Sequence, residues 1–386
     1  MHKPVYDPKF GPEAFKDSED SDIQSQAANL LLLGLYVREN YPMGGKRGFL
    51  NTYSKRDQIR EAINPLRVLA SQTKTRVPIQ HTQTNMVKRY GAAKMAALSR
   101  HAPQEKIASD KEICYDLVQR LYAQPDVDTA SEVLEYFMYN ESDLLRVAAA
   151  ASNFDLSDEP QRVIPVLAAA TSSPDTLARD IAATVLARIA PQHPRVLALS
   201  RGASTQADGT PSNTSLLVHG TWAKQAAWWH PGGDFHTYLL NHVRRDLYNR
   251  PDRFDWSGGY SHEARVDAAE EFIAWTTAKQ ISSPDVFTHS HGGSAVMLAS
   301  HRPGLKIKEL VLLSCPVHLD RYFPNFSNIQ KTVSIRVRLD LVILADFGGQ
   351  KFKHPNIEEN VLPIWFDHAA THEEQVWVDH NVPNML

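Results

Sequence analysis

Residues 285–293 read DVFTHSHGG, and this stretch decides the fold. A short β-favouring run leads into a turn at Ser290, and a helix-favouring run of small residues follows. This layout predicts a nucleophile elbow, in which a serine stands on a sharp strand-to-helix turn with its hydroxyl above the sheet edge. Gly292 and Gly293 suit such a turn because strand and helix approach closely there. Thr288 stands where the first glycine of G-x-S-x-G usually lies, so the match to that pattern is incomplete.

Further stretches of residues 215–386 carry a resemblance to a known family. They read VHGTW, WWHPGGDFHTYL (228–239), FDWSGGYSHEAR (254–265), THSHGG and HAATHEEQVW. With these stretches, this part of the chain resembles serine hydrolases of the α/β-hydrolase fold and is similar to bacterial lipase-like and esterase-like proteins. The resemblance covers less than half of the chain. It implies cleavage of a small-molecule acyl ester without a metal or an organic cofactor.

The resemblance also implies an oxyanion hole made of two backbone N–H groups. In this fold a strand ending in His-Gly delivers one of them, which here belongs to Thr221, and the residue after the nucleophile delivers the other, which belongs to His291. Such preorganised donors act on negative charge that develops only in the transition state. Loss of one typically costs about a hundredfold to a thousandfold in rate.

Short apolar runs alternate with helical patterns through this part of the chain. The runs long enough for strands are 215–219, 285–288, 309–314, 333–341 and 361–366, and 262–280 has helical spacing. The alternation predicts an α/β fold with a doubly wound, mostly parallel sheet of the α/β-hydrolase type, preceded by an all-α domain. Ligands of such sheets bind at the carboxyl ends of the strands. Both Ser290 and the HGT loop follow strand carboxyl ends, as that rule requires.

A serine nucleophile needs a base, and the base needs an orienting acid. In this fold the chain order is serine, acid and histidine. Asp340 stands at the end of the run from Val333 to Leu339, where similar hydrolases carry a D-x-V step, and is the predicted acid. Asp346, just before Phe347-Gly348-Gly349, is the alternative acid.

The base is expected after the last predicted strand, where His368 and His372 both lie. In the hydrolases that this chain resembles, the base is the first histidine of an H-x3-H pattern that precedes a tryptophan. His368, His372 and Trp377 reproduce that spacing, which favours His368 and leaves His372 as the alternative base. Position is needed for this choice because the chain contains 17 histidines.

Length and composition limit the class of protein. A chain of 386 residues is long enough for two domains, and a net charge of −3 gives no general signature of nucleic-acid binding. Two cysteines cannot form a disulfide framework and fit a reducing compartment. The N-terminus lacks a signal-peptide pattern, and the leucine run 30–35 is too short to span a bilayer. We therefore expect a cytoplasmic protein without a transmembrane segment.

The predicted domains are a helical domain over 1–199, a linker over 200–214 and the α/β domain over 215–386. The linker is small, polar and rich in turn-forming residues. Within 109–190 the helical patterns include an echo at 33 residues, in which Arg146 is matched by Arg179. This spacing resembles helical-hairpin repeats of the HEAT or armadillo kind, and a generic helical bundle is the alternative.

Residues 44–100 form a basic segment with twelve Lys or Arg against Asp57 and Glu61. Such a segment fits an anionic surface, or it docks within the molecule on the acidic remainder of the chain. Few aromatic residues are interleaved with the basic ones, which argues against single-stranded nucleic acid as a partner.

The residues favour a carboxylic ester hydrolase with Ser290 as nucleophile, His368 as base and Asp340 as acid. Thioesterases and acyltransferases share this machinery, so the sequence leaves the leaving group and the acyl acceptor open. A second class also remains open. In it the helical part is a binding platform and the hydrolase fold is degenerate, with Thr288 as the feature that favours this interpretation.

Overall fold

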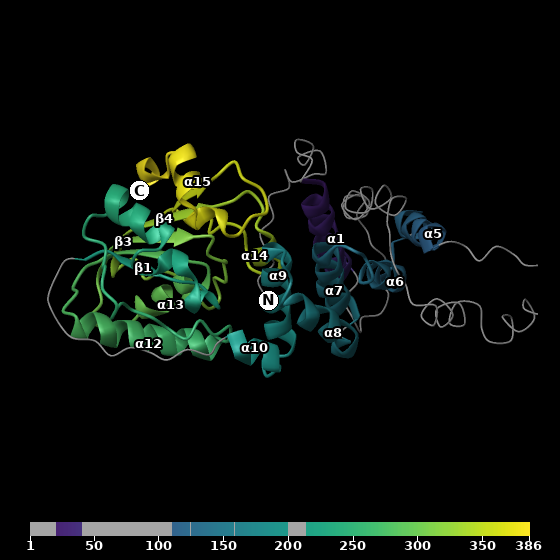
Figure 1. The fold of residues 1–386 in the computed structure, drawn as a ribbon, viewed down its shortest axis with the longest axis horizontal. Helices are drawn as coiled ribbons and strands as arrows, with labels where there is room; N and C mark the ends of the chain where they lie inside the picture. Colours follow the sequence, from purple (N-terminus) through teal and green to yellow (C-terminus); the bar gives the residue numbers. More distant parts are fainter. Residues whose placement is uncertain (1–20, 41–109, 124, 158, 200–213) are drawn as a thin grey trace, which may run out of the picture. The chain divides into compact units, whose positions relative to one another are not determined.

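The computed structural model describes residues 21–40, 110–123, 125–157, 159–199 and 214–386 (Figure 1). The basic segment 44–100 and all but the last residue of the predicted linker 200–214 lie outside these ranges. The chain divides into two compact units, one ending at Ala182 and the other running from Ala183 to Leu386.

In the unit that ends at Ala182, the described residues form helices joined by short turns. Its helices are α1 (Ser21–Asn40), α5 (Asp110–Ala123), α6 (Val127–Phe137), α7 (Asp143–Ser157), α8 (Pro160–Ala170) and the first part of α9 (Thr176–Ile189). The leucine run lies in α1, which packs closely on α7. A Cβ on Gly34 would lie 2.5 Å from the Cβ of Ser152, and the Ser152 hydroxyl donates to the Leu30 carbonyl at 2.8 Å. None of the described helices is both long and apolar enough to cross a membrane.

The sequence echo at 33 residues has a structural counterpart in this unit. Arg146, in the first turn of α7, donates to the Asn140 carbonyl oxygen at 2.7 Å. Arg179, in the first turn of α9, donates to the Ser173 carbonyl oxygen at 3.2 Å. In both places an arginine closes the turn that precedes its own helix by binding a carbonyl oxygen six residues earlier.

The unit from Ala183 to Leu386 contains a five-stranded parallel sheet with strand order β1-β2-β3-β4-β5. Its strands are β1 (Leu216–Val218), β2 (Asp285–His289), β3 (Ile307–Leu313), β4 (Ile329–Arg336) and β5 (Glu358–Val361). The predicted α/β class with a parallel sheet is confirmed. Every residue of β1 and β2 is buried, as expected for strands covered on both faces.

Helices lie on both faces of the sheet, and side chains alternate between the two faces along each strand. Val218, Val286 and Leu310 pack with α12 (His262–Ala278) and α13 (His291–Ala299) on one face. Leu217, Phe287 and Val311 pack on the other face with α11 (Asp234–Tyr238) and α15 (Glu374–Asp379). Figure 1 shows α12 and α13 on the side of the sheet opposite α15. The remaining short helices are α10 (Pro194–Leu199), η2 (Ala223–Gln225), η3 (Ala227–Trp229), η4 (Leu239–Val243), α14 (Leu341–Ala345), η5 (Ala370–His372) and η6 (Val382–Met385).

The predicted bounds of the last two strands are wrong. β4 begins earlier than the predicted run 333–341 and ends at Arg336, and β5 shares only one residue with the predicted run 361–366. The predicted run 361–366 nevertheless lies alongside the end of β4, because the Leu362 N–H donates to the Arg336 carbonyl oxygen at 2.8 Å. Pro363 interrupts the ladder there since it has no N–H to donate. The apolar run 361–366 therefore corresponds to a stretch that continues β5 but is interrupted at Pro363.

Candidate active site

Ser290 occupies a strained turn between β2 and α13. Its backbone has φ 51° and ψ −134°, a conformation that a residue with a Cβ rarely adopts. Such backbone strain costs about 1–3 kcal/mol and persists only where the surrounding structure holds it. Here the Ser290 N–H donates to the Leu313 carbonyl oxygen at 2.9 Å, and the Ser290 carbonyl oxygen accepts from the Gly293 N–H at 3.0 Å. Hydrogen bonds to β3 and to α13 thus fix the turn from both sides.

Three glycines allow the chain to close around Ser290. A Cβ on Gly220 would lie 2.8 Å from the Cβ of Ser290. A Cβ on Gly292 would lie 2.4 Å from the His219 carbonyl oxygen, and one on Gly293 would lie 2.6 Å from the Cys315 Sγ. These separations are too short for a real Cβ. With larger residues at these three positions, the HGT loop and the first turn of α13 could not pack as closely as they do.

Thr288 fits at the position where a glycine was expected. Its side chain is buried, and its hydroxyl donates to the Val311 carbonyl oxygen at 3.1 Å. The bare Cα of Gly293 leaves room beside it, because a Cβ there would lie 3.1 Å from Thr288 Oγ1. The departure from G-x-S-x-G is therefore accommodated by a hydrogen bond across the sheet and by the glycine pair that follows the serine.

Gly292→Ala is expected to destabilise this unit by about 1–3 kcal/mol, because the added methyl overlaps a backbone oxygen that cannot move freely. All seven tryptophans lie in residues 215–386, so urea unfolding followed by tryptophan fluorescence reports on this unit alone. Gly232→Ala is the matched control. Its Cβ meets nothing within 4 Å, and its φ of 87° leaves a conformational cost of about 1 kcal/mol. An unchanged unfolding midpoint for Gly292→Ala would contradict the close approach.

The two predicted oxyanion-hole residues both lie next to residues that contact or adjoin Ser290. Thr221 follows Gly220, which touches Ser290, and His291 is the next residue after Ser290. Within the described residues, neither backbone N–H donates to another protein atom. At Trp222 the chain turns with a φ of 58°, and the Trp222 N–H donates to the Gly258 carbonyl oxygen at 2.9 Å. The backbone of this loop is thus held while the Thr221 N–H is left available.

His219, the histidine of the HGT stretch, anchors that loop in the core. Its ring contacts those of Trp229 and Trp256, with centroid separations of 4.4 and 5.6 Å. Its carbonyl oxygen accepts from the Trp256 indole N–H at 2.9 Å, and its Nδ1 lies 2.7 Å from the Gly220 carbonyl oxygen. Burial lowers the pKa of His219, so the ring is neutral at pH 7. The contacts of His219 thus hold the HGT loop against the core.

Asp340 and His368 form a buried pair. The Nδ1 of His368 lies 2.7 Å from the Asp340 Oδ2, and Asp340 has no exposed surface. The other carboxylate oxygen caps α14 by accepting from the Val342 and Ile343 N–H groups, each at 3.0 Å. An ionised carboxylate can only accept, so the proton of this bond belongs to His368 Nδ1. The pairing leaves Nε2 as the ring nitrogen suited to act as a base.

His289 links this pair to the elbow, although the sequence did not single it out. It directly precedes Ser290, its ring centroid lies 4.7 Å from that of His368, and its Nε2 lies 3.2 Å from the His368 carbonyl oxygen. Burial, together with the neighbouring histidines, lowers the pKa of His289 well below its usual value. A neutral His289 therefore donates Nε2–H to that carbonyl. Its place beside Ser290 in the sequence was the signal that could have identified it.

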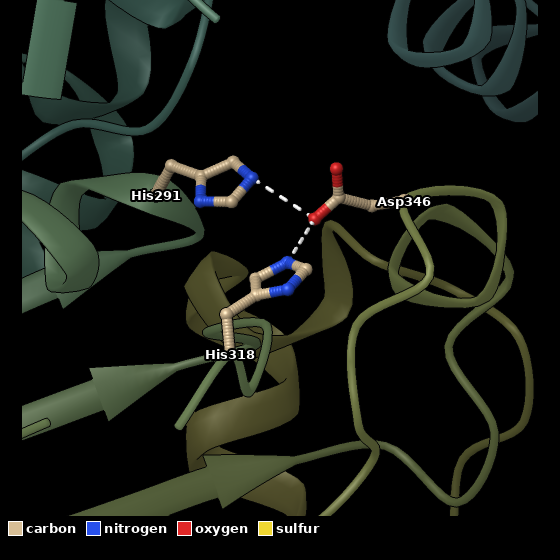
Figure 2. Close-up of side chains that lie close together, drawn as sticks. All are labelled: His291, His318 and Asp346. Atoms are coloured by element: carbon tan, nitrogen blue, oxygen red, sulfur yellow. Dashed lines mark hydrogen bonds and ion pairs between the residues drawn. The ribbon is translucent and has the colours of Figure 1, made fainter. Parts of the chain in front are cut away.

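Asp346, the alternative acid, lies in a different cluster. It accepts from the Tyr260 hydroxyl. It also accepts from His291 Nε2 at 3.1 Å and from His318 Nε2 at 2.7 Å (Figure 2). Burial opposes ionisation of Asp346, but the hydrogen bonds from His291 and His318 outweigh it and hold its pKa well below the usual range. Burial lowers the pKa of His291 to about 3, so that ring is neutral. The structure therefore pairs Asp346 with His291 and His318, whereas His368 is paired with Asp340.

His372, the alternative base, is held by aromatic contacts. Its ring stacks face to face on Trp228 at 4.1 Å and meets His289 edge-on at 4.5 Å. Burial lowers the pKa of His372 to about 4. No carboxylate pairs with it in the part of the chain that the structure describes. Its environment is that of a packing residue beside the elbow.

Comparisons with known proteins give no functional assignment. The sequence matches no protein-family model, and no curated protein matches it. Among solved structures, the chain has a similarity to an uncharacterized protein from Bacillus cereus ATCC 10987, with 11% sequence identity and a TM-score of 0.27. That alignment covers 71% of this chain and 97% of the other. A similarity at this level carries no argument about fold or activity.

Proposed function

We propose that residues 215–386 form a serine hydrolase of the α/β-hydrolase fold that cleaves carboxylic esters, in the manner of an esterase or lipase. The observation that carries the proposal is the buried Asp340–His368 hydrogen bond of 2.7 Å, which His289 joins to the strained turn at Ser290. Packing alone requires neither a serine with a positive φ nor a buried acid–histidine pair. Together they are the parts that an activated nucleophile needs.

In the proposed reaction the Ser290 Oγ attacks the acyl carbon while His368 Nε2 takes the hydroxyl proton. Asp340 holds the ring and stabilises the imidazolium. The Thr221 and His291 N–H groups donate to the oxyanion of the tetrahedral intermediate. Collapse of that intermediate breaks the ester bond, and His368 protonates the departing alcohol. A water molecule that loses its proton to His368 then attacks the acyl-enzyme, which releases the carboxylic acid and restores Ser290.

The proposal also covers the helical part of the chain and the alternatives to ester hydrolysis. The recurring contacts of Arg146 and Arg179 support helical hairpins of the HEAT-like kind within 109–190. A thioesterase or an acyltransferase would use the same serine, because those activities differ in leaving group and acceptor. The Thr288 hydrogen bond to Val311 weakens the case for a degenerate, non-catalytic fold.

Labelling of the full chain with a fluorophosphonate probe is the direct test, since the probe reacts with activated serines. We expect stoichiometric labelling, together with hydrolysis of p-nitrophenyl acyl esters. A panel of short-chain esters, long-chain esters and acyl thioesters, each with and without an added alcohol acceptor, separates esterase, lipase, thioesterase and acyltransferase. A folded chain that neither reacts with the probe nor hydrolyses any member of the panel would establish the non-catalytic alternative.

The choice between the two acids predicts different effects for two matched substitutions. Asp340→Asn is expected to lower kcat by about a thousandfold or more, because the amide cannot hold His368 in the tautomer that leaves Nε2 basic. Asp346→Asn leaves the Asp340–His368 bond in place, so its loss in kcat should be smaller. Steady-state kinetics on one p-nitrophenyl ester measures both. The opposite ranking would assign the catalytic acid to Asp346.

A further inference from the structure

His291, His318 and Asp346 bring three potential metal-ligating atoms together from three separate segments. His291 is the first residue of α13, His318 lies in the loop after β3, and Asp346 ends α14. Figure 2 shows both rings pointing at one carboxylate oxygen of Asp346. The three ligand atoms all lie within 4.8 Å of one another. His291 and Asp346 are buried, whereas His318 is half-buried and provides a route for exchange with solvent.

The outer atoms of His291 and Asp346 also have partners. His291 Nδ1 lies 3.1 Å from the Ser294 Oγ, and the second oxygen of Asp346 accepts from the Tyr260 hydroxyl. Metal-binding histidines and carboxylates in proteins almost always have such outer hydrogen bonds, which set the direction of the ligand atom. His291 Nε2 and His318 Nε2 both face Asp346 Oδ2, as their hydrogen bonds to this oxygen show.

We propose that the side chains of His291, His318 and Asp346 bind a zinc ion, at a site that uses none of the Ser290, His368 and Asp340 side chains and adjoins Ser290 through the backbone of His291. Two imidazole nitrogens and one carboxylate oxygen are a donor set that zinc takes in proteins, with a fourth position left for solvent. Calcium and magnesium prefer oxygen ligands throughout, so this set disfavours them. The N···O separations of 2.7 and 3.1 Å are close to the roughly 3.3 Å between ligands of a tetrahedral zinc ion with bonds of about 2.0 Å.

Binding requires each ring to present an unprotonated Nε2 to the metal. At His291 the proton moves from Nε2 to Nδ1, and the metal takes the place of the two N–H···O bonds to Asp346. The new Nδ1–H of His291 then donates to the Ser294 oxygen, so that contact is kept with its direction reversed. No buried group is left without a partner at this contact.

Arg265 adds a buried positive charge near the proposed site. Its buried guanidinium lies 5.1 Å from the Tyr260 ring centroid, so it is near the site through the tyrosine that binds Asp346. Its Nε and Nη2 have no acceptor among the described residues. A zinc ion beside this cation gives an excess of positive charge, which favours an anion such as hydroxide or a carboxylate as the fourth ligand.

The test uses the full chain, freed of metal with EDTA and then dialysed against Zn²⁺ alone. After desalting, elemental analysis is expected to find about one zinc per chain, as for a site with a fixed ligand set. Co²⁺ in place of Zn²⁺ should give the intense visible absorption of a tetrahedral ion. Zinc should also raise the urea midpoint of the tryptophan-reported unit, since a ligand that binds the folded state stabilises it. These readouts do not depend on ester hydrolysis, so the zinc site and the proposed function can fail separately.

Variants distinguish this site from the other histidines of the chain. His318→Gln should abolish stoichiometric binding, and Ser294→Ala, which removes one outer partner and no ligand, should weaken zinc affinity about 10- to 100-fold. His242→Gln is the control because His242 is exposed and lies outside the cluster. If His318→Gln does not fold, the Ser294→Ala affinity decides. Zinc or Co²⁺ binding that is absent from the natural chain, or equal in all of these variants, would show a hydrogen-bond network without a metal.

Discussion

Replacing Ser290 with alanine is expected to abolish hydrolysis of chromogenic acyl esters and labelling by a fluorophosphonate probe. The substitution removes the oxygen that forms the acyl-enzyme, and loss of a serine nucleophile typically costs about a millionfold in kcat. Ester hydrolysis should therefore fall to a small residual rate that the oxyanion hole and substrate binding still support. Progress curves with p-nitrophenyl esters and in-gel fluorescence of the labelled chain measure the two effects independently.

Two controls make this result specific. Ser257→Ala changes an exposed serine in the loop before α12 and should keep both activity and labelling. Circular dichroism and tryptophan fluorescence of Ser290→Ala should match the natural chain, because alanine keeps the Cβ and the turn is held by backbone hydrogen bonds. Ester hydrolysis that persists near its natural rate in Ser290→Ala would end the serine-hydrolase proposal.

His368→Ala is expected to lower kcat by several orders of magnitude, whereas His372→Ala should keep a measurable fraction of it. His368 holds the hydrogen bond to Asp340, so its removal eliminates the base and leaves the acid without its partner. His372 has aromatic contacts with Trp228 and His289, so its loss removes packing beside the elbow. Steady-state kinetics with one ester, with the fluorophosphonate labelling rate as a second readout, measures the difference.

The conservative variant His372→Gln helps to separate packing from chemistry. If His372 acts through its stacking on Trp228, this variant should alter KM and thermal stability more than kcat. A larger loss of kcat in the His372 variants than in His368→Ala would instead assign the base to His372. Asp340 would then be a residue that caps α14 and holds a neighbouring ring.

The sequence alone was sufficient for features that depend on local interactions. The β-favouring run before Ser290 and the glycines after it predicted a strand, a tight turn and a helix, and the structure has β2, a positive φ and α13 there. The alternation of short apolar runs with helical patterns predicted a parallel sheet, because a crossover helix joins parallel strands that are neighbours in the chain. These properties follow from backbone sterics and from burial along one short stretch.

Strand ends and side-chain partnerships required the tertiary structure. Pro363 ends regular pairing of the last strand, but which N–H groups still find acceptors depends on where the neighbouring strand runs. The predicted linker 200–214 and the basic segment 44–100 are not tested, because they lie almost wholly outside the described residues.

Which histidine meets which acid was decided by the fold. Asp340 and Asp346 are six residues apart in one stretch, yet a short helix between them turns the first toward His368 and the second toward His291 and His318. Sequence spacing places His318 far from both partners, and the loop after β3 brings it within hydrogen-bonding distance of Asp346. Hydrogen bonds and metal coordination depend on separations of a few tenths of an ångström, and such separations are set by how distant segments pack together.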